Sequence, residues 1–356
     1  MTIPRDEAIF PNSKAPEALG FDPAVQRKLL AGIEAGLLRD LHVVLAARSQ
    51  HVFLEHYATG RDENWGTPLG DVTFDADTLH DLRSVTKSVV GLLYGIALDK
   101  GLVPPPDAPL FAQFPEYADL GADSDRSKIT IEHALTMTLG MEWDENRPYT
   151  DPQNSEIAME NAPDRYRFIL DRPIIPEPGT RWIYSGGSVA LVGAIIERGT
   201  GKRLPDFARD VLFEPLDIAR FHWMAGSDGV ASAASGLRLT APDLLKIGML
   251  LLQKGIWNGQ RIVSEGWISQ SFTPAISTED GLGYGRLWFC GEAPAPAFSD
   301  PCPWYAGFGN GGQRLWLMPD AGIAAVVYSG RYNVWDAWIT PTRIWREIIL
   351  ANFLNA

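Results

Sequence analysis

The chain has 356 residues, of which 46% are hydrophobic and 21% charged, and its 31 Lys and Arg against 44 Asp and Glu give a formal net charge of −13. This length allows one large domain or two smaller ones, and the composition is that of an ordinary globular protein. Nucleic-acid binding normally needs a basic patch that releases counterions from phosphates. We see no such patch in this acidic chain, so we expect no nucleic-acid partner.

Targeting and metal-binding signals are also missing from the sequence. The N-terminal stretch MTIPRDEAIFPNSKAPEALG lacks the basic and continuous apolar segments of a secretory signal, and the longest apolar run, residues 89–98, is about half a membrane span. We therefore expect a soluble, cytoplasmic protein with no membrane partner. Cys290 and Cys302 could form a disulfide, although a reducing compartment favours free thiols. Without an HExxH motif or a cysteine cluster, we expect no metal and no cofactor.

The first half of the chain begins with strand signals and continues with helix signals. LHVVLAARSQHVFLEHY, residues 41–57, predicts a β-hairpin that turns at Arg48-Ser49-Gln50. Residues 82–101 predict a long helix that ends at Lys100-Gly101, where glycine suits a C-cap. From there to about residue 225, amphipathic runs dominate and strand signals are sparse, so we expect helices.

The last third returns to strands. Residues 235–255 predict one more helix, after which residues 284–290 and the segments WYAGFG, QRLWLMP and GIAAVVYSG predict short antiparallel strands. ITPTRIWREIILANFL predicts a C-terminal amphipathic helix. The sequence thus predicts an α/β (α+β) protein, with an antiparallel sheet flanked by helices over 1–104 and 226–356 and an all-helical insertion domain over 105–225.

Two glycine-rich motifs resemble functional signatures without their required context. GFGNGG, residues 307–312, fits the dinucleotide pattern G-x-G-x-x-G, but the segment that follows alternates like a strand where a helix is needed. GGSVA, residues 186–190, approaches the G-x-S-x-G nucleophile elbow, but only His222 follows it as a candidate base. We therefore predict that Ser188 is the N-cap of a helix. The other histidines, His42, His51, His56, His80 and His133, are expected to be structural or exposed.

The pair Ser84 and Lys87 forms an S-x-x-K motif at the start of the predicted helix. Residues i and i+3 share a helix face, so the hydroxyl and the amine would be neighbours. A capping serine and a lysine that reaches solvent would be the structural alternative. Because the helix is otherwise apolar, we expect burial and the positive end of the helix dipole to hold Lys87 uncharged. Such an amine can accept the Ser84 proton and activate the hydroxyl as a nucleophile.

A third candidate is Tyr184 in the segment WIYSGG, residues 182–187. By itself a tyrosine before a glycine turn is more often a core aromatic residue. Its hydroxyl could also be the second proton-transfer group of a serine–lysine site.

These motifs, in this order, resemble those of the serine β-lactamase and penicillin-binding-protein fold. S-x-x-K at a helix start, Y-S-G about 100 residues later and a glycine-bearing strand near the C-terminus are most similar to class C β-lactamase-related esterases and 6-aminohexanoate-dimer hydrolases. ALTMTLGM, residues 134–141, and the segment 235–255 extend the resemblance over most of the chain. The resemblance implies that Ser84 is the acyl-accepting nucleophile, Lys87 its base and Tyr184 the proton shuttle, in the place of the tyrosine of the Y-x-N motif.

The family's third motif, K-T-G or H-x-G, has no cationic counterpart here. The resemblance places either Gly307-Phe308-Gly309 or Gly309-Asn310-Gly311 at this strand, and it implies an oxyanion hole made by the strand and by the N–H of Ser84. We favour Asn310 as the donor and expect Phe308, Gly309 and Gly311 to line the substrate site.

The departures from the family pattern bear on the substrate. The missing cation and the replacement of the Y-x-N asparagine by Gly186 disfavour β-lactam cleavage, and Trp143, Trp182 and Trp304 are candidates to line an apolar acyl pocket. We therefore predict a cofactor-free serine hydrolase that cleaves small carboxylic esters or amides through an acyl-enzyme. A β-lactamase or D-alanyl-D-alanine peptidase is the first alternative, and a catalytically inactive binding module of the same fold is the second. The sequence leaves the oligomeric state open.

Overall fold

The computed structural model describes residues 13–355, which divide into two compact units. The first unit contains the chain up to Arg83, Arg238–Gln253 and the chain from Gly291 on; the second contains Ser84–Leu237 and Lys254–Cys290. The domain boundaries predicted from the sequence, at residues 104 and 225, separate a helical segment from the segments that contain the strands. These boundaries stay a prediction. The helix that follows Ser84 belongs to the second unit.

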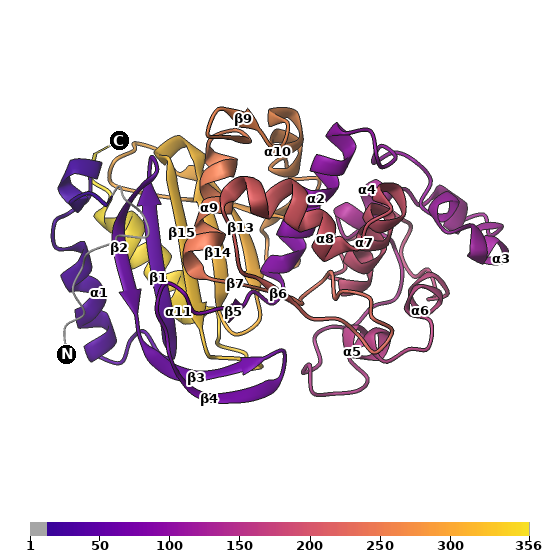
Figure 1. Cartoon of the computed structure of the whole chain (residues 1–356), viewed down its shortest axis with the longest axis horizontal. Helices are drawn as coiled ribbons and strands as arrows, with labels where there is room; N and C mark the ends of the chain where they lie inside the picture. Colours follow the sequence, from indigo (N-terminus) through magenta and orange to yellow (C-terminus); the bar gives the residue numbers. More distant parts are fainter. Residues whose placement is uncertain (1–12, 356) are drawn as a thin grey trace. The chain divides into compact units, whose positions relative to one another are not determined.

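The first unit is built on an antiparallel sheet with the strand order β13-β14-β15-β1-β2 (Figure 1). Its strands are β1 (Leu41–Arg48), β2 (His51–Tyr57), β13 (Cys302–Gly309), β14 (Gln313–Met318) and β15 (Ile323–Ser329). The predicted hairpin is confirmed, and both turn residues have left-handed backbones, with φ of 48° at Ser49 and 70° at Gln50. Such turns match the twist of the paired strands, which explains the tight reversal.

Helices cover both faces of this sheet. A Cβ added to Gly248 of α9 (Ala241–Leu252) would lie 3.0 Å from Leu315 of β14, so this helix packs closely on the strand. Trp316, the next residue of β14, stacks on Trp345 with ring centroids 5.4 Å apart. Successive strand residues point to opposite faces, so α9 and the C-terminal helix lie on opposite sides of the sheet. The C-terminal helix is continuous through α11 (Ile339–Arg343), the π-helical η8 (Ile344–Ile349) and η9 (Leu350–Asn352).

Smaller elements complete the first unit. Helix α1 (Val25–Glu34) contacts β2 and η8. Strands β3 (Thr59–Asn64) and β4 (Thr67–Thr73) form a two-stranded ribbon, and the short strand β5 (His80–Asp81) pairs with β7 (Leu237–Leu239). The chain passes from β5 through two residues to the second unit.

The second unit is mainly helical, and α2 packs against α7. Its helices are α2 (Val85–Asp99), α3 (Ala118–Gly121), α4 (Ile131–Leu135), α5 (Ser155–Glu160), α6 (Arg165–Leu170), α7 (Gly186–Thr200), α8 (Leu204–Ala208) and α10 (Glu265–Ser271). Its short strands are β6 (His222–Trp223), β8 (Ile256–Trp257), β9 (Gln260–Arg261), β10 (Ile276–Ser277) and β11 (Gly283–Tyr284); β12 (Phe289–Ala293) leads back to the first unit. Between residues 105 and 221 the only β-pairing is in isolated bridges, which agrees with the helices predicted there.

Two predicted helix starts are wrong. Residues 235–255 begin with strand β7, and the helix starts only after Thr240, whose side chain accepts a hydrogen bond from the N–H of Asp243. Helix α7 is capped by Ser185, which accepts from the N–H of Ser188, so Ser188 lies within the first turn. In each segment more than one hydroxyl side chain precedes an amide by three residues and could accept its hydrogen bond. The local sequence does not show which of these residues is the N-cap.

Two further predictions concern the cysteines and membrane spans. Cys290 and Cys302 are free thiols, and both side chains are buried. Among residues 13–355, no helix has the length and apolar character needed to cross a membrane.

Candidate active site

A strained residue leads the chain into Ser84. Arg83 has a left-handed backbone with φ of 48°, a conformation that costs a residue with a side chain about 1–3 kcal/mol. Its guanidinium forms ion pairs with Glu63 and, at 3.1 Å, with Asp81, and these pairs hold the turn. The single left-handed residue converts strand β5 into helix α2, so Ser84 stands at the N-cap of α2.

Ser84 and Lys87 are in direct contact, as the S-x-x-K spacing predicts. The Nζ of Lys87 donates hydrogen bonds to Ser84 Oγ at 3.0 Å and to the carbonyl oxygen of Ala234 at 3.1 Å. Lys87 is only 2% exposed, so its amine does not reach solvent as the structural alternative required. The hydroxyl of Ser84 therefore lies beside a buried, fixed hydrogen-bond donor.

Tyr184 joins this pair through the segment that precedes α7. The Nζ of Lys87 lies 4.8 Å from the centroid of the Tyr184 ring. Burial raises the pKa of the Tyr184 hydroxyl, whereas the charge of Lys87 and a hydrogen bond with Ser84 act against the rise. The N-cap at Ser185 fixes the chain immediately after Tyr184. Three side chains that are up to 100 residues apart thus meet at one place.

The structure adds a carboxylate that the sequence analysis missed. The Oε2 of Glu156, on α5, lies 4.0 Å from Lys87 Nζ, and both side chains are at most 2% exposed. The other oxygen of Glu156 accepts a hydrogen bond of 2.6 Å from Ser235 Oγ. A buried ammonium thus has a buried counter-ion, which offsets part of the cost of taking both charges out of water.

A second carboxylate, Glu145, lies next to the first. It accepts hydrogen bonds from Trp143 Nε1 at 2.5 Å, from the hydroxyl of Tyr149 at 3.0 Å and from the N–H of Gly186. Burial, with the charge of Glu156 as the next contribution, raises the pKa of Glu145 to about 7. Neither carboxylate could have been assigned from sequence, because no local spacing links them to the S-x-x-K motif.

The acidic side chains around Lys87, Tyr184 first and then the two carboxylates, contradict the expectation that Lys87 is uncharged. Burial does act to lower its pKa, but Tyr184, Glu156 and Glu145 together act more strongly in the opposite direction, so the pKa of Lys87 lies above its ordinary value. The expectation considered the apolar residues of the helix and omitted acidic groups from other segments. The surroundings of Lys87 thus favour its ammonium form over the neutral amine that the sequence predicted.

Gly186 has a steric role between the two carboxylates. A Cβ at this position would lie 3.0 Å from Glu156 Oε2 and 3.1 Å from Glu145 Oε1, closer than side-chain atoms normally pack. Because the carboxylates occupy this space, the asparagine of a Y-x-N motif would not fit without displacing them. The replacement of the Y-x-N asparagine by Gly186 thus leaves the space that the two carboxylates occupy.

The third-motif residues lie in the first unit, at the end of β13 and in the turn after it. Phe308 pairs with Arg314 of β14, and Gly311 in the turn has φ of 87°, which favours glycine. The side chain of Asn310 is engaged within this unit, where its Oδ1 accepts from the N–H of Asn333 at 3.0 Å. The proposed oxyanion role of Asn310 and the substrate roles of Phe308, Gly309 and Gly311 stay predictions.

A cation does accompany this strand, although its own sequence contains none. Arg314, on β14, donates to the carbonyl oxygen of Gly309 at 3.0 Å, and its guanidinium lies 4.4 Å from the centroid of the Phe308 ring. A guanidinium from the neighbouring strand thus lies beside the end of β13. Sequence reasoning could not see it because the pairing register decides which residue lies beside Phe308.

Two of the three tryptophans predicted to line the acyl pocket, Trp143 and Trp182, belong to the second unit. Trp143 is 9% exposed, binds Glu145 and covers Gly187, where an added Cβ would lie 2.6 Å from the indole. Trp182 is half-buried in an aromatic cluster and lies 5.8 Å from Tyr184 between ring centroids. Their proposed contact with substrate stays a prediction, as does that of Trp304.

Comparison with known proteins agrees with this fold. EstCE1, a hydrolase with promiscuous acyltransferase activity, superposes with a TM-score of 0.72 over 95% of this chain and 99% of its own, at 18% identity. The 6-aminohexanoate-dimer hydrolase of Paenarthrobacter ureafaciens is 26% identical over 85% of this chain and 74% of its own. Esterase EstB of Burkholderia gladioli is 27% identical over 56% of this chain and 48% of its own.

The class follows from the fold and from these relatives. An antiparallel sheet flanked by helices, together with a helical region that carries the Ser84–Lys87 pair, is the arrangement of β-lactamase-fold hydrolases, and we assign the protein to this class of enzymes. The profile of the Beta-lactamase family matches residues 35–337. The chain therefore belongs to the Beta-lactamase family, and the resemblance noted in its sequence is confirmed.

Proposed function

We propose that this protein is a serine hydrolase that cleaves small carboxylic esters or amides through an acyl-enzyme on Ser84. The observation that carries the proposal is the 3.0 Å contact between Lys87 Nζ and Ser84 Oγ in a buried site. The names of two relatives, a 6-aminohexanoate-dimer hydrolase and an esterase, support an amide or an ester as substrate. Among the described residues we assign the reaction to this site and to no other.

The charge of Lys87 determines how the serine is activated. An ammonium cannot accept the Ser84 proton, so its N–H donates to Oγ and stabilises the developing alkoxide. We assign proton acceptance to the coupled pair of Lys87 and Tyr184. Once this pair has lost one proton, the Tyr184 oxygen or the Lys87 amine can take the proton from Ser84.

The same pair can complete both halves of the reaction. Ser84 Oγ attacks the acyl carbon, and the pair passes the proton to the leaving alcohol or amine as the scissile bond breaks. The pair is then unprotonated again and can accept a proton from the water that attacks the acyl-enzyme. The acid product is released and Ser84 regains its proton.

The substrate class follows from the departures in the second motif. The space beside Tyr184 where a Y-x-N asparagine would stand is filled by Glu145 and Glu156, and Gly186 keeps it open to them. We therefore propose that esters and simple amides react better than β-lactams. A nitrophenyl ester compared with a chromogenic cephalosporin separates the two, since a higher kcat/KM for the cephalosporin would indicate the β-lactamase alternative.

A serine-reactive fluorophosphonate tests the nucleophile. We expect one label per chain, on the peptide that contains Ser84, and loss of both label and esterase activity in Ser84→Ala. Ser88→Ala is the matched control, because Ser88 lies one turn further on α2 and donates to the carbonyl of Leu287 instead. Labelling at another residue, or full activity of Ser84→Ala, contradicts the proposal, and absence of any reaction with activated esters favours an inactive binding module.

A further inference from the structure

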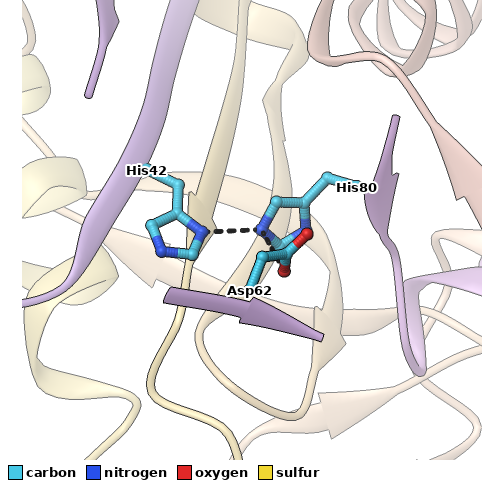
Figure 2. Close-up of side chains that lie close together, drawn as sticks. All are labelled: His42, Asp62 and His80. Carbon is cyan, nitrogen blue, oxygen red and sulfur yellow. Dashed lines mark hydrogen bonds and ion pairs between the residues drawn. The ribbon is translucent and has the colours of Figure 1, made fainter. Parts of the chain in front are cut away.

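Three buried side chains of the first unit meet at one place. His42 on β1, Asp62 on β3 and His80 on β5 are at most 5% exposed, and Figure 2 shows that the three side chains point toward one another from three different segments. One ligand atom from each lies within 4.8 Å of the others. From the sequence, His42 and His80 were expected to be structural or exposed, and no metal site was expected because neither an HExxH motif nor a cysteine cluster is present.

The hydrogen bonds fix which ring nitrogens are available. The Nδ1 of His80 lies 3.0 Å from the carbonyl oxygen of Asp81, and a carbonyl can only accept, so this nitrogen carries the proton. In a neutral ring the Nε2 of His80 then holds a lone pair. This lone pair faces the Nδ1 of His42 at 2.9 Å and the Oδ1 of Asp62 at 3.7 Å. The donation of Nδ1–H to a backbone carbonyl is also the usual outer contact of a histidine that binds a metal.

The Nε2 of His80 can accept a hydrogen bond from the Nδ1 of His42, or it can bind a cation that it shares with Asp62. Asp62 Oδ1 and His80 Nε2 are both acceptors in this arrangement, and the position between them could hold an extra proton or a metal cation. Burial disfavours the imidazolium that an extra proton would create. A divalent ion satisfies the two histidine nitrogens and the carboxylate together.

The groups around the cluster hold the carboxylate and the His42 ring in place. Tyr332 donates a hydrogen bond of 2.9 Å to Asp62 Oδ1, and Arg238 lies 3.5 Å from Oδ2. A Cβ at Gly60 or at Gly330 would lie 2.6 Å from the Nε2 of His42, so two backbone segments fix this ring edge. Most of these contacts do not involve the nitrogen and oxygen atoms that face the centre of the cluster. The exception is the Tyr332 hydroxyl, which donates to Asp62 Oδ1.

A cavity borders the cluster at His42. A cavity of about 610 Å³ is lined by His42, Gly60, Gly330 and Tyr332, among other residues of the first unit. Asp62 and His80 are not among the residues that line this cavity, so an ion that enters it meets His42 and has to pass this ring to reach the other two ligands. Access and a preformed donor set are the requirements of a metal site.

We propose that His42, Asp62 and His80 form a binding site for a divalent transition-metal ion, with Zn²⁺ as the preferred ion. Two imidazoles and one carboxylate are borderline ligands, which suit zinc better than the all-oxygen sets that Mg²⁺ or Ca²⁺ prefer. Zinc lies about 2.1 Å from such ligands, so tetrahedral coordination places two nitrogens about 3.4 Å apart. The two rings therefore need to separate by about half an ångström from their distance of 2.9 Å.

The ion would connect three segments that are distant in sequence. It would bind β1, the ribbon strand β3 and β5, and β5 is the strand that leads through Arg83 into the N-cap of α2. Because such an ion binds the folded chain and not the unfolded one, it raises the temperature of unfolding. This stabilisation is independent of whether Ser84 is a nucleophile.

The test uses the full chain after treatment with a chelator and dialysis. Elemental analysis after incubation with Zn²⁺ should find one zinc per chain, and Zn²⁺ should raise the unfolding temperature whereas Mg²⁺ should not. Co²⁺ in place of zinc should give the visible absorption of a tetrahedral nitrogen–oxygen site. Failure of the wild-type chain to bind zinc or to show this Co²⁺ spectrum overturns the proposal.

Variants distinguish this site from adventitious binding. Asp62→Asn and His80→Gln should each lower the affinity for Zn²⁺ by at least about 10- to 100-fold. A loss of that size is typical when a residue that only contacts a ligand is changed, and these two variants change the ligands themselves. His56→Gln is the matched control, since His56 is half-buried and lines the same cavity but is not part of the cluster. Equal zinc binding by Asp62→Asn and the wild type contradicts the site, and the Co²⁺ spectrum of the wild type decides the question if His80→Gln does not fold.

Discussion

Glu156 and Lys87 form a buried ion pair, with 4.0 Å between Oε2 and Nζ and with side chains that are 1% and 2% exposed. The pair explains why an ammonium is stable on a helix whose other residues are almost all buried and apolar. It also changes the chemistry expected of Lys87, because a stabilised ammonium holds its proton more tightly and cannot act as the base until that proton is lost.

Glu156→Gln should move the pH dependence of the reaction. Without the negative charge, the ammonium of Lys87 loses part of its stabilisation and its pKa falls, so the lysine–tyrosine pair reaches its reactive form at lower pH. The ascending limb of kcat/KM against pH, measured with a nitrophenyl ester, should shift toward acid. Glu160→Gln is the control, since Glu160 is on the same helix but pairs with Arg165 at 3.1 Å. An unshifted limb in Glu156→Gln would show that this carboxylate does not tune the pair.

Glu145 should make stability depend on pH. Its pKa is about 7 in the folded chain and 4.5 is its ordinary value, so between these values the folded state binds more protons than the unfolded state. Stability is therefore greatest below the ordinary value and falls as pH rises to about 7, by at most about 3 kcal/mol. Denaturation at pH 5 and at pH 8 measures this loss, which should be smaller in Glu145→Gln. Equal losses in both proteins would count against the raised pKa.

Tyr184→Phe should lower turnover with little effect on folding. The change removes only the hydroxyl, so kcat for a nitrophenyl ester should fall by about 10²- to 10⁴-fold, the range for loss of a proton-transfer group. The unfolding temperature should stay within a few degrees of that of the wild type. Tyr284→Phe is the control. Tyr284 packs on the same Trp182, with ring centroids 5.5 Å apart, and has no contact with Lys87 in the part of the chain that the structure describes. Similar turnover of Tyr184→Phe and the wild type would remove Tyr184 from the mechanism.

Gly186→Ala should disturb the two carboxylates. The new methyl would lie 3.0 Å from Glu156 Oε2 and 3.1 Å from Glu145 Oε1, and such crowding typically costs about 1–3 kcal/mol. Chemical denaturation should show this loss, together with a fall in kcat. Gly266→Ala is the control, since Gly266 lies in helix α10 with no atom within 4 Å of the added methyl, and it should be neutral or slightly stabilising. Equal stability of both variants would mean that the carboxylates can move aside.

Much of the fold could be predicted because its signals are local. The hairpin at Ser49 and Gln50, the helix that ends before Gly101 and the C-terminal strands all follow from side-chain alternation and from turn or cap residues. The predicted N-cap at Ser188 was wrong by three residues because Ser185 offers the same hydroxyl chemistry. Competing caps differ by less free energy than the packing that decides between them.

The sequence by itself determined the contact between Ser84 and Lys87, because an i, i+3 spacing at a helix start brings two side chains to one face whatever the rest of the chain does. Only the tertiary structure decided the charge of that lysine. Glu145 and Glu156 are brought beside it from other segments, and the electrostatic energy of a buried group depends on every charge near it in space. The same reason hid the cluster of His42, Asp62 and His80, whose members come from three separate strands.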